Sequence, residues 1–97
     1  MTNREDLMIA LLARIAFPDE KLRMLVAQNK RDRNAYIRGY NACDGRRAVN
    51  EIAKIVGVTS GTLVPILQDW ERLGIIYEVQ TELRGKFYRC LYTLEEE

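Results

Sequence analysis

The residue types that perform most enzymatic and metal chemistry are scarce in this sequence. It contains no histidine, and its two cysteines, Cys43 and Cys90, lie far apart and form no Cys-x-x-Cys pair. Zinc would have to use two thiolates plus carboxylates, which is a poor ligand set. Paired carboxylates on one helical face, a phosphate-binding glycine loop and an activated serine or cysteine are also missing. We therefore expect no enzyme, no metal, no cofactor, and two buried, reduced thiols.

Charge is distributed unevenly along the 97 residues. The net charge is +1, but residues 1–48 carry ten Lys/Arg against six Asp/Glu, whereas residues 49–97 carry five against eight. The overall charge therefore gives no argument for binding to nucleic acid. The basic half contains the cluster Lys30-Arg31-Asp32-Arg33. This cluster is either a solvated surface or a patch that contacts phosphates.

Residues 49–74 have the pattern of two short helices joined by a turn. Asn50 is a good N-cap, Gly57 suits the left-handed position that ends a helix, and Thr59 or Ser60 can cap the next helix. The apolar residues of that second helix form one stripe: Leu63, Ile66, Leu67, Trp70 and Leu73. Gly74 closes it. Two helices with this connection make a helix-turn-helix, and the stripe places Trp70 in the core rather than against a base.

The residues on either side complete a small α+β domain. Residues 75–80 and 87–94 read as strands around a polar turn that contains Gly85, so a hairpin follows the last helix. Residues 19–43 read as two helices divided near Asn29–Asn34. Asp44-Gly45 is a turn signal, and residues 46–49 are long enough for a short edge strand.

The N-terminal segment predicts an apolar helix. Thr2 to Glu5 has capping-box spacing, and Pro18 ends this helix and opens the next one. Five apolar residues form the expected dimer interface: Leu7, Met8, Leu11, Leu12 and Ile15. The alternative is that the second helical stretch covers them. The apolar run is shorter than the ~20 residues that span a bilayer, and Glu5-Asp6 fits a signal peptide badly, so we expect a cytoplasmic protein without membrane contact.

Three stretches of the sequence carry a family resemblance. They are Val-Asn-Glu-Ile-Ala-Lys-Ile-Val-Gly-Val-Thr (49–59), Leu-Gln-Asp-Trp-Glu-Arg-Leu-Gly-Ile-Ile (67–76) and Gly-Lys-Phe-Tyr-Arg (85–89). Over residues 36–94 the chain resembles the winged helix-turn-helix transcriptional regulators of bacteria and archaea, of the arsenic-responsive and multiple-antibiotic-resistance type. The resemblance implies a mostly helical α+β fold, with a three-helix core, a two-stranded wing and extra N-terminal helices. Residues 1–35 would form a helical dimerisation extension, and residues 36–97 the winged helix-turn-helix domain.

The resemblance also implies which residues contact DNA. The third helix of the core would lie in the major groove, and the wing would contact the flanking backbone. The groove-facing residues would be Thr59, Ser60, Thr62, Val64, Pro65 and Gln68, and the wing residues Arg84 and Lys86. We expect Arg46, Arg47 and Arg72 to contact DNA as well. Ser60 and Thr62 could instead be helix caps, and the wing cations solvated turn residues.

Val64-Pro65 departs from the family pattern, because related sequences usually have a polar pair there. A proline deep inside a helix costs ~3 kcal/mol, which is avoided if the regular helix starts only at Thr62. The pair could contact thymine methyl groups, or it could belong to a protein-binding patch on a domain that does not bind DNA. A third alternative moves the DNA footprint to the basic half of the chain, on Arg31, Arg33, Arg46 and Arg47.

From these observations we expect a sequence-specific DNA-binding transcriptional regulator that acts as a small homodimer on double-stranded DNA. The alternative is a winged-helix protein–protein interaction module that does not read DNA. A DNA titration separates the two, because phosphate contacts strengthen as salt falls.

Overall fold

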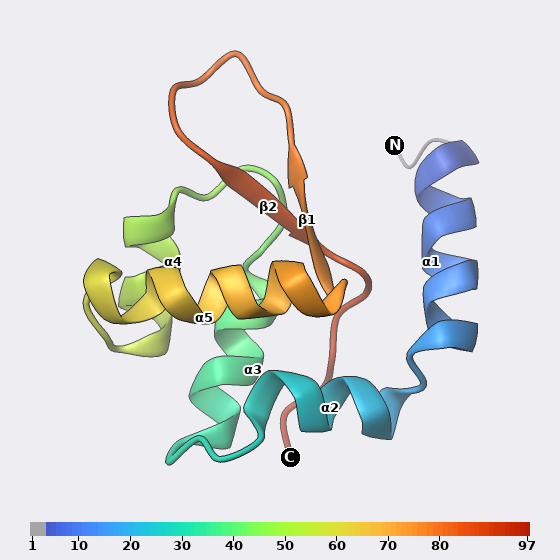
Figure 1. Ribbon diagram of the computed structural model, residues 1–97, viewed down its shortest axis with the longest axis horizontal. Coiled ribbons are helices and arrows are strands. Elements are labelled where there is room, and N and C mark those ends of the chain that lie inside the picture. Colours follow the sequence, from blue (N-terminus) through green and yellow to red (C-terminus); the bar gives the residue numbers. More distant parts are fainter. Residues whose placement is uncertain (1–3) are drawn as a thin grey trace.

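The computed structural model describes residues 4–97, and over this range the protein is an α+β fold that is mostly helical (Figure 1). The elements follow one another as α1 (Arg4–Ala16), α2 (Asp19–Ala27), α3 (Arg33–Asn41), α4 (Val49–Val56), α5 (Ser60–Leu73), β1 (Ile76–Val79) and β2 (Phe87–Cys90). The break before α2 falls at Pro18, and the break between α2 and α3 falls in the expected segment. The N-cap expected at Thr2 lies outside the described residues.

The two strands form an antiparallel hairpin directly after α5. Ile76 pairs with Cys90 and Val79 with Phe87, and Gly85 takes a positive φ of 99° in the connection. The expectation that the second strand runs to Leu94 is wrong. After Cys90 the chain leaves the hairpin, because Asn41 of α3 holds the Leu94 backbone through two hydrogen bonds, of 2.7 and 2.8 Å. The hairpin is therefore compact, and it is compatible with a wing.

The edge strand expected at residues 46–49 is also wrong. Only Asp44 forms an isolated bridge, to Arg89, and the next residues make a turn. The Asp44 carboxylate accepts hydrogen bonds from the backbone N–H groups of Arg46 and Arg47, at 2.9 and 3.2 Å. These two bonds bend the chain away from the sheet. The N-cap of α4 is consequently Ala48 rather than Asn50.

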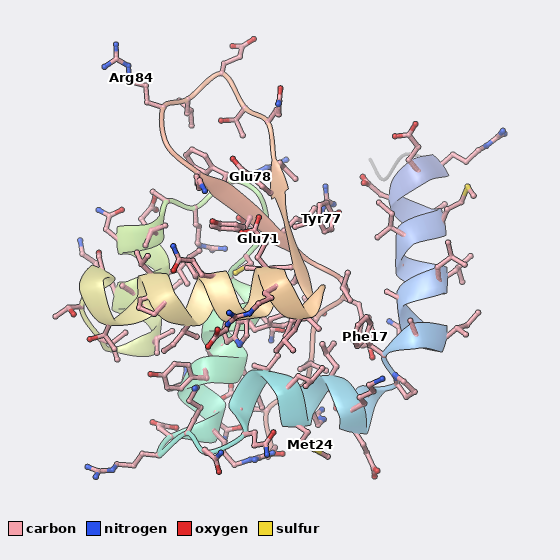
Figure 2. All side chains as sticks on the ribbon, viewed as in Figure 1. Phe17, Met24, Glu71, Tyr77, Glu78 and Arg84 are labelled. Carbon is pink, nitrogen blue, oxygen red and sulfur yellow. The ribbon has the colours of Figure 1, made fainter. Side chains whose placement is uncertain are left out.

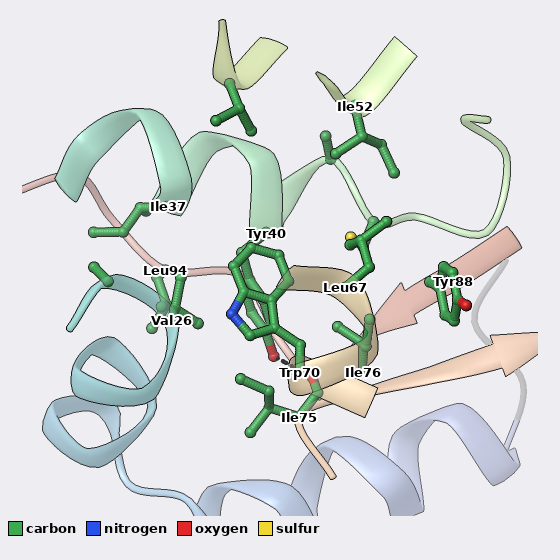
Figure 3. Close-up of a cluster of buried hydrophobic side chains, with 14 of the residues drawn as sticks. Val26, Ile37, Tyr40, Ile52, Leu67, Trp70, Ile75, Ile76, Tyr88 and Leu94 are labelled. Carbon is green, nitrogen blue, oxygen red and sulfur yellow. Dashed lines mark hydrogen bonds between the residues drawn. The ribbon is translucent and has the colours of Figure 1, made fainter. Parts of the chain in front are cut away.

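A single apolar core lies between the helices and the hairpin (Figure 3). Trp70 of α5 is 2% exposed, as the helical stripe predicts, and packs edge-on against Tyr40 of α3 with ring centroids 5.5 Å apart. The Tyr40 hydroxyl donates to the Ile75 carbonyl at 2.7 Å and accepts from the Leu91 N–H at 3.2 Å. Tyr40 thus joins α3, the start of the hairpin and the segment after it.

The helix α1 turns its large apolar side chains towards solvent and its small or polar side chains towards the rest of the protein. Its inward face consists of small or polar positions, Asp6, Ala10 and Ala13, of which only Ala13 is buried. Asp6 approaches Arg89 at 3.5 Å, and Arg14 stacks on the ring of Tyr92. The large apolar residues face solvent instead: Leu7, Met8, Ile9, Leu11, Leu12 and Ile15, with Ile15 78% exposed. The alternative that α2 covers this face is wrong for these side chains.

The C-terminal segment packs along α3. Asn34 holds the Glu97 backbone through two hydrogen bonds, of 2.8 and 3.2 Å, in the way that Asn41 holds Leu94. Arg33 makes a two-pronged contact with the Glu97 carboxylate, at 2.6 and 2.9 Å, and Arg38 pairs with Glu96 at 2.5 Å. The uneven charge of the two halves is therefore partly neutralised within the chain.

Among residues 4–97, no helix has the length and apolar character needed to cross a membrane.

Candidate nucleic-acid interface

The connection between α4 and α5 is built from a glycine and a threonine cap. Gly57 ends α4 with a φ of 91°, in the left-handed region where a side chain would be strained. Thr59 is the N-cap of α5, and its hydroxyl oxygen accepts the Thr62 N–H at 3.2 Å. The same Thr59 hydroxyl lies 3.0 Å from the hydroxyl of Thr62. Both threonines therefore have local partners, and capping is confirmed for Thr59.

The helix α5 begins at Ser60, two residues before Thr62. The later start that would place Pro65 in the first turn is therefore wrong, and Pro65 lies in the second turn. Pro65 has no N–H to offer the Gly61 carbonyl. Both residues are exposed, so water can bond that carbonyl instead.

The surface of α5 opposite the core is an exposed ridge. At 100° per residue, Gly61, Pro65, Gln68 and Arg72 point away from the stripe that contains Trp70. Within the described residues, neither Ser60 nor Gln68 has a hydrogen bond from its side chain, so both can bind an external group. Arg72 instead forms an ion pair with Asp69 on the same helix.

Cations stand on the hairpin side of this ridge. Arg84 lies in the connection between the strands, and Figure 2 shows its side chain pointing away from the body of the molecule. Arg84, Lys86 and Arg46 have no ion-pair partner in the part of the chain that the structure describes. Arg47 is held by Asp44 at 2.8 Å.

A hollow of about 270 Å³ separates α5 from the hairpin, and its lining includes Val49, Val64, Leu67, Gln68, Lys86 and Tyr88. It brings together the expected site residues Val64, Gln68 and Lys86. Val49, Leu67 and Tyr88 were not expected at this surface. Period-2 alternation along the second strand could have drawn attention to Tyr88, but Leu67 reads only as core.

Acidic groups lie at the hairpin end of α5. Burial raises the pKa of the Tyr88 hydroxyl, and the nearby carboxylates of Glu71 and Glu78 raise it further. Figure 2 shows Glu78 on the paired part of the hairpin, above Glu71 of α5. Any polyanion at this surface therefore meets attraction at the hairpin connection and repulsion along the paired strands beside α5.

The basic half of the chain does not form one footprint. Arg31 and Arg33 precede or begin α3, whereas Arg46 and Arg47 follow its far end (Figure 1). Arg33 is paired with Glu97, and Asp32 caps α3 by accepting the Ala35 N–H at 3.1 Å. The helix α3 is nine residues, about 13 Å, long, and the two pairs of arginines lie beyond or at its opposite ends. The alternative footprint on these four arginines is thus divided between the two ends of a helix.

The cysteines lie opposite each other at the base of the hairpin. The Cys90 N–H donates to the Cys43 carbonyl at 2.8 Å, and both thiols are free. Cys43 is buried and Cys90 half-buried. Burial raises the pKa of the Cys43 thiol to about 12 and that of Cys90 to about 11, so both are weak nucleophiles near neutral pH.

Comparison of the chain with protein-family models, with curated proteins and with solved structures gives no match.

Proposed function

We propose that this protein is a sequence-specific DNA-binding transcriptional regulator with a winged helix-turn-helix architecture. In this proposal α3, α4 and α5 are the three-helix core, and the β1–β2 hairpin is the wing. The observation that carries it is that Gln68 of α5 and Lys86 of the hairpin line one hollow. An amide that can read a base and a cation that can bind a phosphate therefore face the same ligand. A DNA duplex presents a partner for each, with base edges in its groove and phosphates in the flanking backbone.

The proposed DNA contacts are ranked by whether each side chain already has a partner among the described residues. Arg84, Lys86 and Arg46 need no release from an ion pair and would bind phosphates. Gln68 and Ser60 would reach base edges or phosphates, because Gln suits the N6 and N7 atoms of adenine. Arg47 and Arg72 would first have to exchange Asp44 and Asp69 for DNA. Thr59 and Thr62 serve the start of α5.

The proposed regulator is a homodimer through α1. The outward apolar face of α1 exposes an area on the order of 500 Å², comparable with the largest apolar patches of monomeric proteins. A symmetric pair would bury this face twice, because a two-fold interface uses the same surface on both subunits. Two copies would also present two α5 helices, as a palindromic operator requires.

A titration of labelled duplex DNA at low and moderate salt tests the proposal. We expect affinity to rise as salt falls, and Lys86→Ala to reduce the slope of log affinity against log salt by about 1. Lys21→Ala on α2, which lies on the other side of α5 from the hairpin connection (Figure 1), is the matched control and should leave the slope unchanged. Affinity that stays unmeasurable at low salt would rule the proposal out.

A second candidate function, docking on another protein, is favoured by the 39% exposure of Val64 beside Pro65. The double substitution Val64→Ser and Pro65→Arg separates the two functions. It should weaken a protein complex, whereas the added arginine should preserve or strengthen nonspecific attachment to DNA. Partner binding that survives this change contradicts the docking function.

A further inference from the structure

The hollow between α5 and the hairpin has an apolar floor and polar ends. Val49, Val64, Leu67 and the ring of Tyr88 supply the apolar lining, while Gln68 and Lys86 supply one amide and one cation. Val64 is 39% exposed although it is β-branched and apolar, whereas Leu67, one turn along, is 1% exposed. The exposed side of the hollow therefore combines a methyl-bearing surface with hydrogen-bonding and charged groups.

The occupant that fits this combination carries an apolar group a few ångströms from a hydrogen-bonding edge and from negative charge. An A·T base pair presents all three in the major groove: the thymine C5-methyl, the N6 and N7 atoms of adenine, and the adjacent phosphates. The groove is also wide enough to admit an α-helix. Gln68 lies four residues after Val64, so both side chains lie on the same side of α5.

Charge near the hollow is of both signs: the carboxylates of Glu71 and Glu78 act on Tyr88, whereas one cation lines the hollow and a second lies close to it in sequence. Lys86 lines it, and Arg46 lies three residues before Val49, at the start of α4. Neither cation has an ion-pair partner within residues 4–97. A purely apolar peptide would leave both cations uncompensated, whereas the phosphates beside a base pair would compensate them.

We infer that this hollow is a thymine-reading site: a thymine C5-methyl packs on Val64 while Gln68 bonds an adenine, so the protein selects A·T pairs at the centre of each α5 contact. The inference rests on the proposed DNA-binding function. It assigns specificity to apolar contact at the position where polar readers were expected. Lys86 then fixes the register by holding a phosphate, and carries no sequence information itself.

The test begins with selection of duplexes from a random pool by the full chain. We expect A·T pairs to be enriched in each half-site. In the selected duplex, replacing deoxythymidine by deoxyuridine removes only the C5-methyl. Loss of one buried methyl should lower affinity about 4-fold, as expected from about 0.8 kcal/mol per buried carbon.

Variants locate the effect. Val64→Ala should reduce the thymine-to-uracil discrimination towards 1-fold, and Val64→Thr, which keeps the β-branched shape, should weaken it less. Leu73→Ala is the matched control, because Leu73 is an exposed apolar residue on the other side of α5 and should leave the discrimination at about 4-fold. Circular dichroism of each variant verifies that it is folded.

Each outcome has one meaning. Duplex binding with equal affinity for thymine and uracil, or selection of G·C pairs, overturns the thymine site and leaves the DNA-binding function standing. Discrimination that persists in Val64→Ala also overturns the site. Failure to bind any duplex at low salt overturns both.

Discussion

The Tyr40 hydroxyl of α3 donates a 2.7 Å hydrogen bond to the carbonyl of Ile75, at the point where α5 passes into the hairpin. The same oxygen accepts the Leu91 N–H as the chain leaves the hairpin. Tyr40→Phe would keep the ring against Trp70 but leave two backbone groups without their partner. We expect unfolding to become easier by about 1–3 kcal/mol, measured by urea denaturation. A loss below about 0.5 kcal/mol would show that water replaces the hydroxyl.

Gly39 allows α3 and α4 to approach closely. A Cβ at this position would overlap Cγ2 of Val56, whereas a Cβ at Gly61 would meet only Thr59 Oγ1, at 3.9 Å. We expect Gly39→Ala to destabilise the fold by about 1–3 kcal/mol through overpacking, despite the higher helix propensity of alanine. Gly61→Ala is the control and should be neutral or stabilising. Equal thermal midpoints for the two variants would contradict this close packing.

The stability of the fold should decline in alkali. Folding raises the pKa of Cys43 from 9.0 to about 12 and that of Cys90 from 9.0 to about 11. Above pH 9 the unfolded chain loses these protons while the folded chain keeps them, so stability is full below pH 9 and falls as pH rises. The loss should reach about 1.4 kcal/mol per thiol at pH 10. Urea denaturation at pH 7, 9 and 10 measures it, and Cys43→Ala should show a smaller decline than the unmodified chain.

The segment after the hairpin should depend more on amides than on charges. Asn41→Ala removes both hydrogen bonds to Leu94, which are partly buried, and should cost about 1–3 kcal/mol. Glu96→Gln removes one exposed ion pair, to Arg38, and should change stability far less. Urea denaturation at low and high salt compares the two variants. A larger effect of Glu96→Gln, abolished by salt, would reverse this ranking.

Self-association should depend on the outward face of α1. Light scattering after size exclusion should give twice the 11.3 kDa mass of one chain. Leu11→Glu with Ile15→Glu should give a folded monomer, because a buried carboxylate pair would be strongly disfavoured in the interface. Leu83→Glu, at an exposed leucine of the hairpin connection, is the control. A monomer in the unmodified chain at micromolar concentration would contradict the dimer.

Local rules predicted most of the fold. Pro18, Gly57 and Gly74 mark helix boundaries because proline and left-handed glycine act within one turn. The stripe through Trp70 identifies the core face of α5 except at Leu73, which is 45% exposed. The edge strand at 46–49 and the long second strand were wrong for a common reason. In both places a side chain, Asp44 or Asn41, holds backbone groups that a strand would have paired.

Val64, Gln68 and Lys86 were expected at this surface from the sequence, but the other lining residues and the shape of the hollow were not. Spacing on one helix places Val64 and Gln68 on one side of α5. The meeting of these residues with Lys86 and Tyr88 depends on how the hairpin folds back on α5, which is a long-range contact. The ion pair of Arg33 with Glu97 is likewise a long-range contact that local sequence patterns do not predict. The cluster at 30–33 was therefore expected to have more unpaired charge than the structure shows.

The contacts of α3 with residues 94–97 constrain the order in which parts of the fold form during synthesis. Asn34, Arg38 and Asn41 emerge from a ribosome more than fifty residues before their partners at 94–97. The helices can form and begin to pack against one another early. The contacts between α3 and residues 94–97, however, form only after residue 97 has left the ribosomal exit tunnel. Contacts this distant in sequence slow folding. A nascent chain stalled at residue 90 should therefore be protease-sensitive along α3, and emergence of residues 94–97 should complete its protection.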